Sequence, residues 1–234
     1  MRLQRWQRVQ LLGLTAAAAV SVILKLPSGD LWVGTDGAGL HRVRFDSAGV
    51  AQIKHFQAEG AGLPSNRIYA LSQGAAGIWV GTRDGIAQID PVSEIITRPS
   101  IPGALDPFAL NADEVFEDAQ GRLWIGTWES GLFRVDATRS EVKHYLPDTQ
   151  AGAGLRSTRV VSLHSDSTGR MWFGTGAGIS YLVEDCDCIR SLPLDLSGRD
   201  VQAATYIVDA LSDGDGGLWL GTWGEGVVRV PANA

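Results

Sequence analysis

The sequence is poor in the residues that carry most enzyme chemistry and most cross-links. Its 234 residues include only two cysteines and four histidines. The cysteines, Cys186 and Cys188, are too close in sequence to staple distant parts of a fold, so we expect an incidental surface pair. Two thiols alone make a poor zinc site. No histidine has a serine or cysteine nucleophile at a readable spacing, so the sequence predicts no catalytic residues, no metal site and no cofactor.

Basic charge and long hydrophobic runs are also scarce. There are 20 Lys and Arg against 26 Asp and Glu, a net charge of −6, and no basic patch that would suit nucleic acid. One apolar run, VQLLGLTAAAAVSVIL, follows the basic MRLQRWQR, and this pair is typical of a secretory signal peptide. No other stretch approaches the roughly 18 apolar residues of a membrane span. We therefore expect no nucleic-acid partner and no membrane span.

What the chain has in abundance is glycine, tryptophan and internal repetition. It holds 29 glycines and 8 tryptophans, and the segment WxGT, preceded by an apolar residue and followed by a glycine-led apolar segment such as GLFRV, occurs five times. The tryptophans of this motif are Trp32, Trp79, Trp124, Trp172 and Trp219. Their spacings of 47, 45, 48 and 47 residues are close to the length of one four-stranded propeller blade.

Each repeat reads as four short strands separated by turns. The tryptophan segment is apolar at successive positions, as expected of a strand covered on both faces. No repeat contains an apolar stripe of helical period, which disfavours a β-α solenoid. The sequence predicts an all-β fold over 1–234: a single five-bladed β-propeller of four-stranded antiparallel blades.

The two ends of the chain complement each other. The fifth repeat stops after its third strand, at GVVRVPANA, whereas LQRWQ near the start aligns with IKHFQ of the first repeat. We therefore prefer a strand over a signal peptide for residues 2–8, and predict that this strand completes the fifth blade and closes the ring. Deleting residues 1–10 would then cost several kcal/mol of stability.

The repeat resembles the two-component regulator propeller family. Residues 115–136, VFEDAQGRLWIGTWESGLFRVD, match that pattern nearly throughout, although Leu26 and Gln73 replace its acidic turn residue. The resemblance implies a periplasmic or otherwise extracytoplasmic sensor module of a bacterial signalling receptor. A more distant likeness links the tryptophan strand to streptogramin-lyase propellers.

The residues just after each GT vary from repeat to repeat, as expected of a surface that packing does not dictate. They include Asp36, Arg83, Trp128 and Trp223, and acids follow both tryptophans at Glu129 and Glu225. Aromatic rings beside carboxylates suit sugar rings or cationic groups. The loops before the inner strands, which carry Arg67 and Arg159, would frame the same face.

Two further acids, Glu114 and Asp209, lie near the start of an inner strand and are candidates to point into the channel. The alternative interpretation is structural throughout: each tryptophan covers a neighbouring loop and the acids are solvated.

The sequence thus favours a ligand-binding or sensor module, with a small molecule or carbohydrate as ligand. A protein partner or a downstream signalling domain would complete its function. A protein-interaction scaffold is the alternative. A propeller lyase or glycosidase is less favoured, because an enzyme needs convergent acid and base groups and only Glu114, Glu129, Asp209 and Glu225 are candidates.

Overall fold

The computed structural model describes residues 19–99, 110–148, 153–192, 205–213 and 215–231. These residues form five antiparallel sheets, the first four with four strands each and the last with three. The first blade consists of β1 (Val20–Lys25), β2 (Leu31–Thr35), β3 (Leu40–Phe45) and β4 (Ala51–Phe56). The second consists of β5 (Ile68–Gly74), β6 (Gly77–Thr82), β7 (Gly85–Ile89) and β8 (Ile96–Thr97).

The remaining three blades follow the same order along the chain. The third consists of β9 (Ala112–Glu117), β10 (Leu123–Thr127), β11 (Leu132–Val135) and β12 (Val142–Tyr145). The fourth consists of β13 (Val160–Ser165), β14 (Met171–Thr175), β15 (Gly178–Val183) and β16 (Cys188–Leu192). The fifth consists of β17 (Ile207–Ser212), β18 (Leu218–Thr222) and β19 (Gly226–Val230). Two short helical segments, α1 (Ala58–Ala61) and η2 (Glu184–Cys186), lie in connections.

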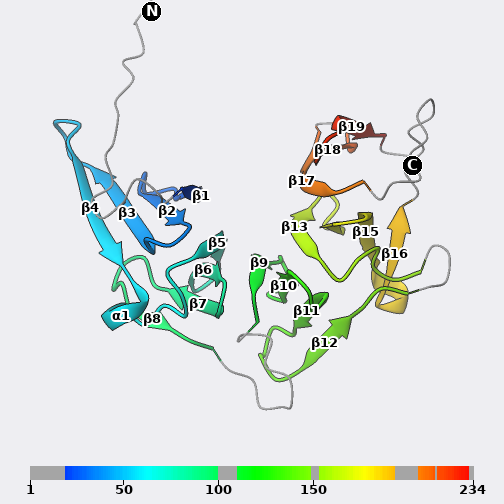
Figure 1. The fold of residues 1–234 in the computed structure, drawn as a ribbon, viewed down its shortest axis with the longest axis horizontal. Helices are drawn as coiled ribbons and strands as arrows, with labels where there is room; N and C mark the ends of the chain where they lie inside the picture. The colour runs from blue at the N-terminus through cyan, green and yellow to red at the C-terminus, as the bar shows by residue number, and fades with distance from the viewer. Residues whose placement is uncertain (1–18, 100–109, 149–152, 193–204, 214, 232–234) are drawn as a thin grey trace, which may run out of the picture.

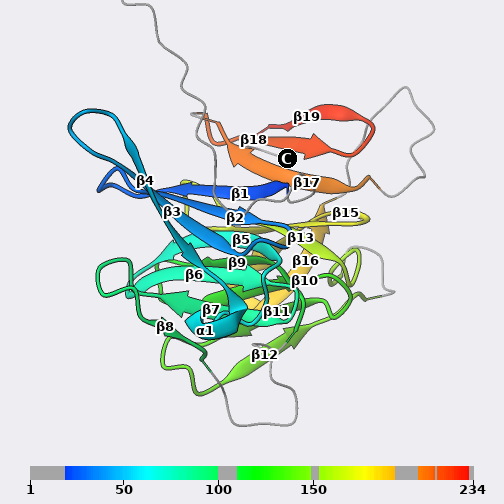
Figure 2. The same ribbon diagram turned by 60° about the vertical axis from the view of Figure 1, so that its left-hand side comes forward.

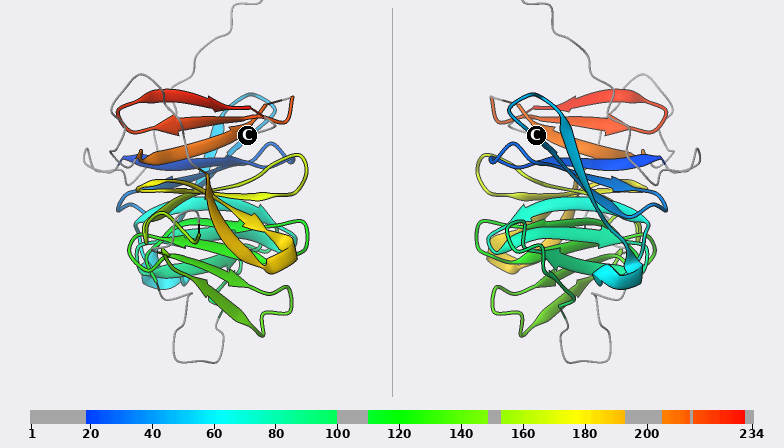
Figure 3. Two further views of the ribbon diagram at one scale, coloured as in Figure 1. Left: turned by 90° about the vertical axis from the view of Figure 1, so that its right-hand side faces the viewer. Right: turned by 90° about the vertical axis from the view of Figure 1, so that its left-hand side faces the viewer.

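The blades are arranged in sequence order in a propeller-like arc. The first strands β5, β9, β13 and β17 lie toward the inside of the arc, and β4, β12 and β16 lie toward its outside (Figure 1). Seen from the side, the strands of successive blades run along roughly a common direction (Figures 2 and 3). The predicted all-β architecture of repeated antiparallel blades is confirmed, including the motif tryptophans on the second strand of every blade.

Ring closure remains a prediction. The first and fifth blades lie at the two ends of the arc (Figure 1). The predicted closing strand, residues 2–8, lies outside the described residues.

Hydrophobic clusters lie between successive blades and hold the arc together. Between the first and second blades, Trp32, Leu40 and Phe56 pack against Ile68 and Val80. Between the third and fourth, Trp124 stacks on Tyr145 and lies 5.2 Å, centroid to centroid, from Phe173. Each of the first four blades therefore buries its tryptophan against the blade that follows, which explains the apolar run of this strand.

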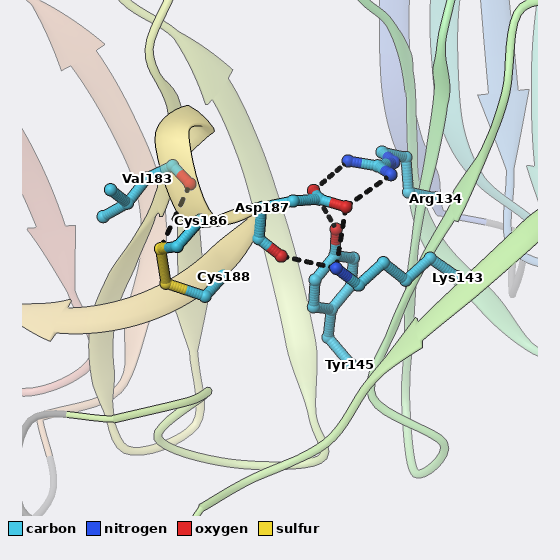
Figure 4. The surroundings of a disulfide bond; sticks show 7 residues. All are labelled: Arg134, Lys143, Tyr145, Val183, Cys186, Asp187 and Cys188. Carbon is cyan, nitrogen blue, oxygen red and sulfur yellow. Dashed lines mark hydrogen bonds and ion pairs between the residues drawn. A yellow bond between two sulfur atoms is a disulfide. The ribbon is translucent and has the colours of Figure 1, made fainter.

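A disulfide joins Cys186 to Cys188 at the turn between β15 and β16, which corrects the expectation of an incidental pair (Figure 4). Asp187 lies between the two cysteines with a positive φ of 48°. Its carboxylate accepts hydrogen bonds from Arg134, Lys143 and Tyr145 of the third blade. Burial alone would raise the pKa of Asp187, but these partners lower it to about 2. The disulfide turn thus ties the fourth blade to the third.

Candidate ligand-binding site on the inner side of the arc

A β-bulge at the start of every inner strand builds the site. The register shifts between Ile68 and Ala70, and again between Val160 and Ser162 and between Ile207 and Asp209. The same irregularity occurs in β1 and in β9, so one residue per inner strand is left out of the pairing. Such bulges re-aim side chains, and they are common next to functional sites.

The bulge residues of blades two to five line a cavity of about 380 Å³. They are Tyr69, Asp113, Val161 and Val208. The other lining residues come from the ends of neighbouring strands: Asn111, Trp128, Arg159 and Tyr206. The cavity therefore combines aromatic and aliphatic surface with a few polar groups, which is the usual make-up of a small-molecule site.

Arg159 is stacked between two aromatic rings from different blades. Its guanidinium carbon lies 3.1 Å from the ring centroid of Trp128 and 4.7 Å from that of Tyr206. Tyr206 in turn makes an edge contact with Trp223, with centroids 6.4 Å apart. The two tryptophans of the sequence hypothesis are thus linked through Arg159 and Tyr206, and Arg159 is the cationic partner of Trp128.

Three buried polar atoms in this cavity have no hydrogen-bond partner among the described residues. They are Asn111 Oδ1, Asp113 Oδ2 and Arg159 Nε. A buried polar group without a partner costs about 1–3 kcal/mol, so such groups are uncommon in folded proteins. Residues that line the cavity therefore hold two acceptors and one donor whose hydrogen bonds are unmade among the described residues.

Carboxyl groups near the cavity have raised pKa values. Burial raises the pKa of Asp113 to about 6, against the opposing charge of Arg159. Burial also raises the pKa of Glu114 to about 8; the hydrogen bond from the Val115 N–H opposes this, and the charges of Asp209 and Asp113 add to it. Glu114 and Asp209 thus interact electrostatically across two blades, although neither lines the cavity.

The remaining candidate residues from the sequence lie outside the cavity, in the loops between the second and third strands, which are called the rim below. Asp36 forms an ion pair with Arg67 at 3.5 Å, and the N–H of Arg83 donates to the carbonyl of Arg67. Asp36, Arg83, Glu129 and Glu225 are not among the residues that line the cavity. The Trp128 side chain is partly exposed and that of Trp223 is largely exposed. The backbone N–H of Trp128 donates to the carbonyl of Asn111, and the backbone N–H of Trp223 donates to the carbonyl of Tyr206.

A larger hollow of about 800 Å³ lies beside the disulfide, lined in part by Lys143, Tyr145, Asp187 and Arg190. Its central carboxylate, Asp187, is already saturated by the third blade. We therefore place the candidate site in the cavity of the inner strands, where polar groups are left over. Among the described residues, no three His, Cys, Asp or Glu side chains are grouped to hold a metal ion.

Comparison with known proteins agrees with the repeat and the fold. The sequence profile "Two component regulator propeller" matches residues 62–84, 114–129 and 154–177, so the chain contains repeats of this family. The extracellular domain of the hybrid two-component system BT3049 of B. thetaiotaomicron superimposes with a TM-score of 0.71 and 19% identity. It aligns with 97% of this chain, which spans 29% of that domain.

A second extracellular domain, of the system BT4673 of the same organism, gives a TM-score of 0.70 at 23% identity, over 92% of this chain and 30% of that one. Histidine kinase P4 of Formosa agariphila is 26% identical over 158 residues, which are 65% of this chain and 11% of the kinase. The chain therefore spans less than a third of the length of these relatives. No helix among the described residues has the length and apolar character needed to cross a membrane.

Proposed function

We propose that this chain is a ligand-sensing module of an extracytoplasmic signalling receptor, and that the ligand binds in the cavity of the inner strands. Similarity to extracellular domains of two-component systems and to a histidine kinase supports the signalling role. The Cys186–Cys188 disulfide supports an oxidising compartment, because disulfides persist outside the cytosol.

The observation that carries the binding proposal is the set of unpaired polar atoms in a cavity with aromatic walls. A hydroxyl-rich ligand such as an oligosaccharide satisfies this set once the three buried groups turn toward it: its hydroxyls donate to Asn111 Oδ1 and Asp113 Oδ2 and accept from Arg159 Nε. Its C–H faces pack on Tyr69, Tyr206 or the free part of Trp128. Because Arg159 covers one face of the Trp128 ring, a ligand in the cavity contacts the guanidinium and the exposed part of the ring together.

The test is calorimetry against an oligosaccharide panel with Trp128→Ala, Trp223→Ala and the double variant. Loss of the Trp128 contact costs about 1–2 kcal/mol, and loss of Trp223 removes the ring that packs against Tyr206 of the cavity wall, so the double variant should bind at least tenfold more weakly. A matched control is Asp36→Ala/Arg67→Ala, which removes the rim pair of the first blade and should leave affinity unchanged.

Equal binding by the parent and the Trp128→Ala/Trp223→Ala variant would refute this site. Unfolding of that variant, seen by circular dichroism, would assign both tryptophans to packing instead. Binding to no member of the panel would refute the carbohydrate class.

A further inference from the structure

The contact between successive blades follows one geometric rule. In the first four blades, the glycine of the GT pair lies against the first residue of the next inner strand: Gly34 on Ile68, Gly81 on Ala112, Gly126 on Val160 and Gly174 on Ile207. A Cβ placed on Gly126 would lie 2.7 Å from the carbonyl oxygen of Val160, so only glycine allows this approach. The four glycines are therefore explained by the blade that covers them.

Apolar side chains around each of these glycines are buried by the same contact. The first four motif tryptophans are at most 6% exposed. The residue that pairs with the glycine on the third strand is at most 1% exposed in each of the first four blades. These residues are Leu40, Ile86, Leu132 and Ile179.

The fifth blade carries the same face without a cover. Among the described residues, the three atoms nearest to the Cβ position of Gly221 lie 3.5 Å or more away and belong to Val208 and Asp209 of its own blade. Trp219 is 43% exposed and Val227, which pairs with Gly221, is 68% exposed. The glycine and the apolar residues of a blade contact are thus present at one end of the arc, with nothing among the described residues seated on them.

The first blade carries the complementary half. Val20 pairs with Thr35 as Ile207 pairs with Thr222, so it holds the position that covers the preceding glycine in other blades. It is 48% exposed, and Ile23 on the same strand is 62% exposed. Val33, which pairs with Ile23, is buried, so β1 carries the open part of this face.

We propose that two copies of this chain associate head to tail, with β1 of one copy packed on the outer face of β17–β19 of the other. Val20 of the second copy sits on Gly221, and Ile23 lies beside it. The contact continues the blade-to-blade interface that the chain already uses four times. A second copy is the occupant because this one chain carries both halves of the interface, and neither half is covered by any of the described residues.

Such an interface is heterologous, because it joins two different surfaces. It therefore leaves a free β1 face and a free β17–β19 face on every dimer and permits further growth. This property separates the proposal from a symmetric dimer, in which the same patch meets itself.

The experiment uses two single variants and light scattering coupled to size-exclusion chromatography. Gly221→Ile occupies the space that Val20 of the second copy would fill, and the fifth blade itself leaves room for the new side chain. Ile23→Asp places a charge on the other half of the contact. Wild type should show a mass above the 25.0 kDa monomer that rises with concentration, and each variant alone should be monomeric.

The decisive sample is the equimolar mixture of the two variants. Gly221→Ile keeps an intact β1 face and Ile23→Asp keeps an intact β17–β19 face, so the mixture should form a 1:1 dimer and nothing larger. Val92→Asp, at an exposed apolar residue far along the chain from both faces, is the matched control and should associate as wild type does. Circular dichroism spectra check that all variants are folded.

Three results would overturn the proposal. A monomeric wild type at all concentrations would point to a closed ring or to a different partner. Association of either single variant alone would point to a symmetric interface. Failure of the mixed variants to form the 1:1 dimer, while both remain folded, would show that these two faces do not meet.

Discussion

The first and third blades carry the same tryptophan in the same register, but its indole N–H meets different surroundings. In the third blade, Trp124 Nε1 donates to Asp118 at 2.8 Å. In the first blade the equivalent turn residue is Leu26, and Trp32 Nε1 is buried without a hydrogen-bond partner among the described residues. The second blade, with Gln73 in the turn, uses Glu117 of the next blade instead, at 2.6 Å from Trp79 Nε1.

The same two blades differ on the third strand and at the rim. His41 occupies the position of Phe133, and both are fully buried. At the rim, an exposed ion pair joins Asp36 of the first blade to Arg67 at the start of the second, whereas Trp128 of the third blade stacks on Arg159 at the start of the fourth. The repeat motif therefore determines the fold of each blade. The positions that differ between blades determine whether the buried indole N–H has a hydrogen-bond acceptor and which side chains face a ligand.

The largest expected difference comes from giving the third blade the turn residue of the first. Asp118 accepts hydrogen bonds from two backbone N–H groups of its turn, from Trp124 and from Arg122. Asp118→Leu leaves these donors without their acceptor and should lower the free energy of unfolding by about 3–5 kcal/mol, measured by urea denaturation.

The control for Asp118→Leu is Asp46→Leu. Asp46 also accepts two backbone N–H groups of a turn, at Ala48 and Val50, but it is exposed and these bonds involve no tryptophan. It should cost about 1 kcal/mol. Equal losses in the two variants would contradict the role assigned to the buried indole.

A second, smaller effect depends on pH. Burial lowers the pKa of His41 to about 4, with a further contribution from the charge of His55. The unfolded chain, with a histidine pKa near 6.5, binds more protons between these values, so stability falls as the pH falls from about 6.5 to about 4. His41→Phe, which copies Phe133, should remove about 2 kcal/mol of the loss between pH 7 and pH 5.

The comparison of wild type with His41→Phe isolates this contribution, because the carboxylates titrate in both. Urea denaturation at the two pH values measures it. Parallel pH profiles for the two proteins would show that His41 does not carry the effect.

The smallest difference concerns the two indoles themselves. Trp124→Phe removes a donor from Asp118, whereas Trp32→Phe removes a buried N–H that has no partner. Both lose similar apolar contact, so Trp124→Phe should cost about 1–2 kcal/mol more than Trp32→Phe in urea denaturation followed by circular dichroism. A larger loss at Trp32 would reverse the comparison.

The repeat motif was sufficient to predict most of the fold. The spacing of the five tryptophans predicted the blades, and each motif tryptophan lies on the second strand of its blade. The sequence shows Leu26 at the position of the acidic turn residue. Whether the Trp32 indole N–H then lacks an acceptor depends on which neighbouring side chains reach it, and the sequence does not show this. The disulfide was missed because spacing was judged against distant cross-links only.

The site was predictable only in part. The variable residues after each GT led to Trp128 and Trp223, whereas Tyr69, Asn111, Asp113 and Tyr206 were missed. The β-bulges that re-aim Tyr69 and Asp113 are defined by the pairing of the inner strand with the second strand, which the sequences of β5 and β9 do not reveal. The stack of Arg159 on Trp128 joins two different repeats, and repeat alignment does not report contacts between neighbours.

Hydrogen–deuterium exchange of the unmodified chain, with and without the oligosaccharide that gives the strongest calorimetric signal, tests the central claim most directly. We predict slower exchange on binding at the amides around Asn111, Trp128, Arg159 and Tyr206, where the inner strands of blades three to five begin. Exchange at the rim of the first blade, around Asp36, should not change. Protection confined to that rim or to the outer strands would contradict the proposed site.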